Sequence, residues 1–242
     1  MDSLLKLRDI PAVEPEWLST GLPRLDQVLG GGFVPHTLTL FAGHAGAGKS
    51  SLMTRISGQV IAANKKVLYI SAEESAEQFK LRAMRFKLPA STDNLLITTD
   101  ATLTQVEKHA LAIKPDLLII DSIQSLRESS EKLKEIRLEN IRSSRVLMAA
   151  VMALKAQLST AIILIGHETK NREISGAYSV QHLVDVVLKL DRNESTGQRV
   201  LTVKKNRFAD ISIKYAFSIT PNGELDDSPP HIVPYRKPPD VI

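Results

Sequence analysis

The sequence predicts an α/β fold: a mostly parallel central β-sheet flanked by helices on both faces, with a β-hairpin near the C-terminal end. Three observations lead to this class. Apolar strand-like runs alternate with helical patterns, a complete glycine-rich motif lies between one such strand and helix, and the last two strand-like runs follow each other directly. With 242 residues, of which 43% are hydrophobic, the chain can build one sizeable domain but not a second full one.

Hydrophobic periodicity, prolines and glycines divide the chain into successive elements. A first short helix ends near Leu29, because three glycines follow it. Short runs rich in aliphatic residues are interpreted as buried strands, and amphipathic segments that end before a proline or glycine as helices. After the first helix we expect, in order, a strand at 37–42, a helix from 49, a strand at 67–71, a helix at 76–87, a strand at 95–98, a helix at 102–114, a strand at 117–120, a helix at 146–158, a strand at 161–167, a helix at 176–184, and strands at 186–190, 199–204 and 211–219, the last two as a hairpin.

The chain divides into three parts. Residues 1–17 are expected to form an N-terminal arm that lies on the domain, and residues 18–220 form the domain itself. Residues 221–242 contain six prolines and no periodicity. We interpret them as a C-terminal tail that is either disordered or laid on a surface.

Composition excludes several classes of protein. The chain has no cysteine, which rules out disulfides and cysteine-based zinc sites. Its start lacks a long apolar segment and no run of 18 apolar residues occurs, so we expect a soluble, cytoplasmic protein with no membrane partner. The net charge of +4 permits a polyanionic partner but does not by itself indicate one.

The glycine-rich motif at residues 43–50 is the most informative stretch. It matches G-x-x-x-x-G-K-[ST] in full, follows an apolar strand and opens an amphipathic helix. Such a loop turns its backbone N–H groups toward phosphate, and the N-terminus of the next helix adds a positive field. We expect ATP here, with Lys49 at the β- and γ-phosphates and the Ser50 hydroxyl as a ligand of Mg²⁺. The expected nucleotide-binding residues are Gly43, His44, Ala45, Gly46, Ala47, Gly48, Lys49, Ser50 and Ser51.

Carboxylates follow two other predicted strands. Asp121 comes after four aliphatic residues, at the sheet edge where α/β proteins place ligands, and is expected to hold Mg²⁺. Glu73 and Glu74 follow the strand at 67–71, where a carboxylate could activate the attacking water. Alternatively, Glu74 and Ser71 have the spacing of a helix-capping box.

Three further segments each have two interpretations. His167 ends a strand and is either a γ-phosphate sensor or an ordinary structural histidine. The segment 204–208 is expected in the turn of the last hairpin, either as a solvated tip or as a cation pair inserted into a neighbouring subunit's phosphate site. The charged segment 127–145 is either a solvated helix with i,i+4 pairs or a sequence-independent contact with nucleic-acid phosphates.

Taken together, these segments resemble the ATPase core of the bacterial RadA/Sms DNA-repair proteins, within the RecA/DnaB class. The resemblance covers about residues 18–219. It rests on the glycine-rich motif and on the amino-acid sequences of segments 19–32, 68–75, 121–125, 166–170, 182–185 and 205–209. It implies a RecA-like fold and ATP hydrolysis at the interfaces of a homo-oligomeric, hexameric ring. It further implies single-stranded DNA in the ring's centre, branch migration or unwinding in recombination or repair, and a recombinase or helicase as a possible partner.

The resemblance also implies roles for individual residues. Glu73 would be the catalytic base, and Lys205 and Arg207 would act on the site of a neighbouring subunit. DNA-facing loops would lie near residues 127–145 and 168–175. The candidate DNA contacts in and near them are Arg127, Lys132, Lys134, Arg142, Arg145, Lys170 and Arg172.

The sequence departs from the family pattern in several places. Ala209 stands where the signature has glycine, and Ala177 where the family tends to have proline. Typical members also carry a four-cysteine zinc module and a Lon-protease-like domain, neither of which is found in this sequence, so we expect a minimal member or a core that relies on separate partners. Two other functions stay open: a KaiC-like signalling ATPase that switches protein partners without DNA, and a nucleotide-binding helicase loader or accessory subunit.

Overall fold

The structure, a computed structural model, describes residues 6–9, 16–86, 88–127, 141–168, 178–211, 213–220, 224–226 and 232–234. The strands are β1 (Leu38–Gly43), β2 (Val67–Ser71), β3 (Leu95–Thr98), β4 (Leu117–Asp121), β5 (Ala161–His167), β6 (Val186–Arg192), β7 (Arg199–Asn206), β8 (Ile213–Ile219), β9 (Leu225–Asp226) and β10 (Ile232–Pro234). The α-helices are α1 (Pro23–Leu29), α2 (Lys49–Ala62), α3 (Ala76–Met84), α4 (Leu103–Ile113), α5 (Ile141–Gln157) and α6 (Tyr178–Leu183), and the short 3₁₀ helices are η1 (Leu7–Asp9) and η2 (Ile123–Ser125).

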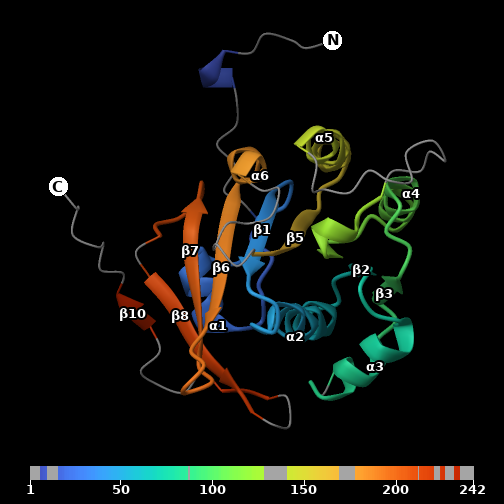
Figure 1. Cartoon of the computed structure of the whole chain (residues 1–242). Helices are drawn as coiled ribbons and strands as arrows, with labels where there is room; N and C mark the ends of the chain where they lie inside the picture. The colour runs from blue at the N-terminus through green and yellow to red at the C-terminus, as the bar shows by residue number, and fades with distance from the viewer. Residues whose placement is uncertain are drawn as a thin grey trace.

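The described residues form a 10-stranded sheet in the order β10-β8-β7-β6-β1-β5-β4-β2-β3, with β9 paired to β8 (Figure 1). The pairs from β6–β1 to β2–β3 in this order are parallel, whereas the pairs β6–β7, β7–β8 and β8–β10 are antiparallel. The predicted fold class, a mostly parallel sheet with C-terminal antiparallel strands, is therefore confirmed.

Successive residues of the central strands point into two different cores, one on each face of the sheet. In β1, Phe41 packs in the core under α1, α2 and α3, whereas Leu40 packs in the core under α4, α5 and α6. In β5, Ile163 and Leu164 divide in the same way. Because helices cover both faces, the central strands are continuous apolar runs rather than alternating ones.

Most elements lie within a few residues of their predicted bounds. Helix α3 ends at Met84, three residues before the predicted end, and α5 begins at Ile141, five residues before its predicted start. The N-terminus of α3 is fixed by a capping box between Ser75 and Gln78. The alternative in which Ser71 and Glu74 form that capping box is therefore wrong.

The structure describes parts of both ends of the chain. Strands β9 and β10 both pair with β8, so the described residues of 221–242 extend the sheet, which agrees with a tail that is laid on a surface. The physical reason is that an edge strand leaves backbone N–H and C=O groups unpaired, and a short extended segment satisfies them. At the other end, η1 buries no residue, so the expected packing of the arm is not found there, although Trp17 lies against Gly31. The division into arm, domain and tail stays a prediction.

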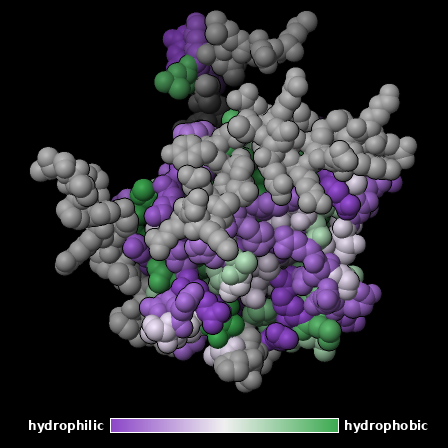
Figure 2. Space-filling view, viewed as in Figure 1, coloured by the Kyte–Doolittle hydropathy of each residue, from purple (hydrophilic) through white to green (hydrophobic). Residues whose placement is uncertain are grey.

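The described surface visible in Figure 2 is mostly hydrophilic, with hydrophobic side chains in small separate patches. Among the residues that the structure describes, no helix is long and apolar enough to span a bilayer.

Candidate functional site

The predicted site residues meet at one edge of the parallel sheet. Gly43, at the end of β1, is paired with His167 at the end of β5. Asp121 ends β4 and is paired with Ile165 of β5 on one side and Ser71 of β2 on the other. Since parallel strands end at the same edge, the segments that follow them converge there.

Lys49 lies at the start of α2 and is only 3% exposed. Its ammonium donates hydrogen bonds to the carbonyls of Gly43 (2.8 Å) and His44 (2.9 Å), and lies 3.4 Å from Nδ1 of His167. Burial lowers the pKa of Lys49, and the negative charges of Asp121 and two glutamates oppose this shift. An ammonium that is buried beside backbone carbonyls would gain from a bound anion, because the anion restores the charge interactions lost with water.

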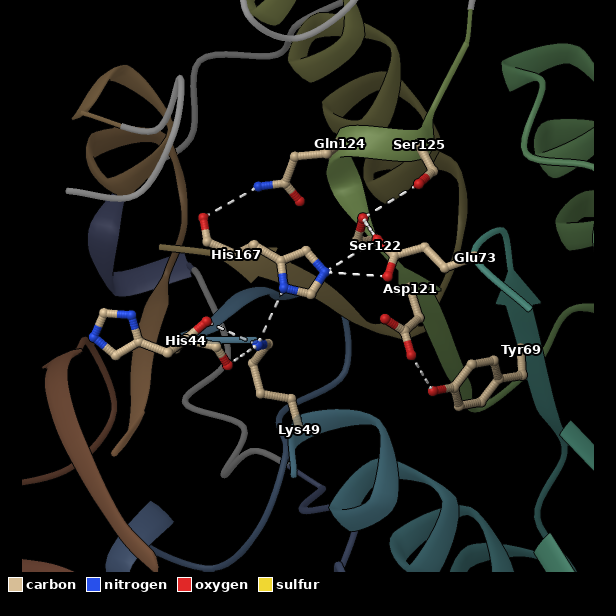
Figure 3. Close-up of polar contacts among 10 residues, drawn as sticks. His44, Lys49, Tyr69, Glu73, Asp121, Ser122, Gln124, Ser125 and His167 are labelled. Atoms are coloured by element: carbon tan, nitrogen blue, oxygen red, sulfur yellow. Dashed lines mark hydrogen bonds and ion pairs between the residues drawn. The ribbon is translucent and has the colours of Figure 1, made fainter. Parts of the chain in front are cut away.

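His167 joins Lys49 to Glu73 (Figure 3). Its Nε2 lies 3.0 Å from Oε1 of Glu73, and the same carboxylate accepts a short hydrogen bond from Ser122, which in turn contacts Ser125. Because the Lys49 ammonium can only donate, Nδ1 of His167 accepts and the ring proton lies on Nε2, facing Glu73. The sequence singled out Lys49, Glu73 and His167 separately, and the structure brings them together in one line of contacts.

Glu74, the neighbouring glutamate, faces elsewhere. Its carboxylate accepts hydrogen bonds from Arg82 and from the hydroxyl of Ser71 (3.3 Å). The two glutamates therefore have different partners, and only Glu73 contacts the histidine.

Asp121 has a partner that the sequence did not indicate. The hydroxyl of Tyr69 donates a hydrogen bond of 2.7 Å to Oδ2 of Asp121, and both residues are buried. Tyr69 belongs to β2 and the two residues are 52 positions apart in the chain, so only the pairing of β2 with β4 brings them together.

Arg199, at the start of β7, is a second residue that the sequence did not indicate. The Nε of Arg199 donates a hydrogen bond to the carbonyl of Ala47 (3.1 Å). Gly48 has a φ of +100°, and a Cβ at this position would lie only 2.8 Å from the Nε of Arg199. Glycine therefore leaves room for the guanidinium. Burial, and to a lesser extent the charge of Arg192, lowers the pKa of Arg199. This second cation beside the phosphate loop strengthens the preference of the site for an anion.

One residue of the loop, His44, also belongs to a cluster of possible metal ligands. His44, Glu168 and Asp191 bring one potential metal-ligand atom each within 4.8 Å of one another. The ammonium of Lys189 already pairs with both carboxylates, at 3.2 Å to Glu168 and 3.5 Å to Asp191. The Lys189 ammonium thus takes the position that a metal ion would need. The ring of His44 points away from Lys49 (Figure 3).

Lys205 and Arg207 lie at the opposite edge of the sheet. β7 continues to Asn206, so the prediction that Lys205 lies in the turn is wrong. Lys205 donates to the carbonyls of Gln181, His182 and Val184 at the end of α6, at 3.2, 3.4 and 2.6 Å.

The guanidinium of Arg207 donates to Oδ1 of Asp185 (3.1 Å) and its side chain is 57% exposed. Asp185 is buried and also accepts from Lys155 and from the backbone N–H of Leu38. Neither Lys205 nor Arg207 contacts the phosphate loop of its own chain, so their proposed catalytic role concerns another copy or none.

Of the candidate DNA contacts, Arg127 is exposed and its backbone pairs with Thr102. Arg142 and Arg145 lie in the first turns of α5, and their side chains are outside the described part of the structure. Lys132, Lys134, Lys170 and Arg172 lie outside the described residues altogether. The backbone from Ile141 onward is helical, and the choice between a solvated helix and a contact with nucleic-acid phosphates stays open.

Comparison with known proteins identifies related sequences. The profile of the AAA domain family matches residues 3–173. The chain is 36% identical over 213 residues to the DNA repair protein RadA of Listeria monocytogenes, which covers 88% of this chain and 46% of that protein. The corresponding values are 34% over 204 residues (84% and 42%) for DNA repair protein RadA of Mycobacterium tuberculosis, and 32% over 228 residues (94% and 48%) for that of Escherichia coli K12. The chain thus spans about half the length of these relatives, and the resemblance inferred from the motifs is confirmed.

Proposed function

Because the chain belongs to the AAA domain family and has a P-loop ATPase-like fold, we propose that it binds ATP with Mg²⁺ and hydrolyses it. One observation carries this proposal: Lys49, His167 and Glu73 form a continuous line of contacts at the strand ends, beside Asp121. A phosphate-binding cation, a candidate base and a candidate metal ligand are the parts that phosphoryl transfer to water requires.

The residues present fit this ligand. A Cβ at Gly46, which has a φ of +76°, would meet nothing within 4 Å, so the loop is open on that side. Among the described residues, the ammonium of Lys49 contacts only two carbonyls and a ring nitrogen, and no carboxylate neutralises it directly. Helix α2 has 14 residues, so its N-terminus adds a positive field. Ser50 and Asp121 would hold Mg²⁺, which when bound neutralises phosphate charge.

Glu73 and His167 would have different roles in hydrolysis. The side chain of Glu73 is held in place by the hydroxyl of Ser122 and by Nε2 of His167, and it accepts a proton from the attacking water. His167 contacts Lys49 on its other nitrogen, so a change at the phosphate loop is transmitted through the ring to Glu73 and to the chain that follows β5.

Lys49→Ala is expected to abolish hydrolysis and to weaken ATP binding at least about tenfold, because the loop loses its charge-assisted contact with phosphate. The fold should persist, since the removed ammonium is partly desolvated and its carbonyl partners stay in place. Thermal unfolding with and without MgATP measures this: at the same MgATP concentration the variant gains less stability from the nucleotide than the wild type. Lys65→Ala, which removes an exposed ion pair with Asp116, is the matched control, and normal turnover in Lys49→Ala would refute the assignment.

We further propose that active sites are shared in a homo-oligomeric ring. The phosphate loop lies at the carboxyl ends of the parallel strands. Arg207 directly follows Asn206, which ends β7 and is paired with Val186 at the start of β6, so it lies near the opposite strand ends. Figure 1 shows that β7 and β6 run side by side. The seven residues of β6 span about 20 Å, so Arg207 does not reach its own site. Head-to-tail contact between copies would bring one copy's Arg207 to the next copy's loop, and such contacts form a ring when the rotation between copies closes. A hexamer is the ring size that the family resemblance favours.

The names of the relatives support a role in DNA repair for this chain. We propose single-stranded DNA as the polymer, because the family resemblance implies it. Binding is expected to be independent of sequence and to weaken with salt, with a slope of about −0.7 in log K per neutralised phosphate. A salt titration with a labelled oligonucleotide measures the slope, and Arg142→Ala with Arg145→Ala should make it less steep. If no binding occurs at low salt, the protein acts as a nucleotide-driven switch of protein partners instead.

A further inference from the structure

Tyr69 contacts Asp121, the proposed metal ligand. Neither the motifs nor the family resemblance assigns a role to Tyr69. It is 0% exposed and lies on β2, paired with Ile119 of β4, while Asp121 lies two residues further along β4 on the same face. The long side chain of Tyr69 spans this diagonal, and its hydroxyl reaches Oδ2 of Asp121 at 2.7 Å.

We propose that Tyr69 is a positioning residue for the metal site: its hydroxyl holds one oxygen of Asp121 and keeps the other directed toward the phosphate loop. In Figure 3 the oxygen of Asp121 that does not contact Tyr69 lies on the side of Lys49 and His167. A carboxylate fixed in this way loses little rotational freedom when it takes up Mg²⁺ or its water shell. The inference rests on the proposed metal role of Asp121.

The surroundings of the ring keep the hydroxyl in one place. Phe79 packs against the ring edge-on, with centroids 4.7 Å apart at an interplanar angle of 65°. The guanidinium of Arg82 lies 4.9 Å from the Phe79 centroid and 5.9 Å from the Tyr69 centroid, and it is itself held by Glu74. Two residues of α3 therefore hold the ring of Tyr69 in a fixed position against the sheet.

The phenol of Tyr69 is a buried hydrogen-bond donor. Burial, together with the negative charge of Asp121, raises the pKa of Tyr69 well above its usual range. A buried phenol needs some acceptor, but a backbone carbonyl would serve equally well for stability alone.

The test is Tyr69→Phe, which keeps the ring and removes only the hydroxyl. The probe is a fluorescent ATP analogue, titrated with Mg²⁺ and, separately, in EDTA. The Mg²⁺ concentration for half-maximal binding and hydrolysis is expected to rise about tenfold, as is typical when a partner of a metal-ligating carboxylate is removed, while metal-free nucleotide binding stays unchanged. Tyr215→Phe is the matched control, because Tyr215 is equally buried but lies on β8, in the antiparallel part of the sheet.

Two outcomes overturn the inference. If the Mg²⁺ dependence of Tyr69→Phe equals that of the wild type and of Tyr215→Phe, Tyr69 only satisfies its own hydroxyl. If Tyr69→Phe weakens metal-free and metal-dependent binding equally, the effect is one of packing. Asp121→Asn separates these results from a failure of the proposed function: it must shift the Mg²⁺ dependence if Asp121 is the metal ligand, whatever Tyr69→Phe does.

Discussion

Arg207→Ala is expected to lower ATP turnover about 10³-fold while leaving ATP affinity within a few-fold of the wild type. An arginine supplied by another subunit stabilises charge that develops in the transition state, and its removal therefore lowers kcat rather than ground-state binding. The fold should tolerate the change, because the Arg207 side chain is 57% exposed and Asp185 keeps its bonds with Lys155 and Leu38. Steady-state hydrolysis and equilibrium binding of a fluorescent ATP analogue give the two values.

The control for Arg207→Ala is a mixing experiment. Arg207→Ala chains have an intact Glu73, and Glu73→Gln chains have an intact Arg207, so a mixed ring contains some complete sites. Mixing should restore part of the activity that each variant lacks alone. The absence of rescue in a verified mixed oligomer, or wild-type turnover that does not fall on dilution, would contradict the sharing of sites.

Glu73→Gln is expected to lower the hydrolysis rate by about 10² to 10⁴-fold, the usual contribution of a general base. Glutamine keeps the size of the side chain and an acceptor oxygen for Ser122 and His167, but it takes no proton from water. ATP should therefore remain bound for longer than in the wild type, as single-turnover kinetics would measure.

Glu74→Gln is the matched control for Glu73→Gln. The two glutamates are adjacent in sequence, but Glu74 contacts Ser71 and Arg82 rather than His167. Its loss should change turnover only a few-fold and lower the midpoint of thermal unfolding instead. A larger loss of turnover from Glu74→Gln than from Glu73→Gln would exchange the two roles.

Strand β7 gives the proposed ring a physical means of coupling its sites. Arg199, at one end of β7, contacts the phosphate loop of its own chain, whereas Lys205 and Arg207 lie at the other end. A head-to-tail contact would place that second end beside the next copy's nucleotide. A shift of β7 in response to one nucleotide would thus alter the cations offered to the adjacent site.

The sequence prediction missed strand residues whose conformation depends on pairing with a neighbouring strand. Lys205 read as part of a turn because the run of polar residues 204–207 breaks the apolar alternation of β7, yet its pairing with β6 continues to Asn206. Likewise, β9 and β10 are too short to show the alternation of a strand, and prolines lie close to them in the sequence. They form because β8 has unpaired backbone groups with which they can pair.

The sequence by itself determined the phosphate loop, the order of strands and helices, and the acids and histidine at the strand ends. These features are local: a glycine loop, an apolar run and the residue that ends it can be read from neighbours in the chain. Only the tertiary structure decided which of those residues touch, that Tyr69 holds Asp121, that Arg199 reaches Ala47, and that Arg207 lies away from its own site. Such contacts depend on strand register and crossover connections between residues that are 22 to 152 positions apart, and no local pattern specifies them.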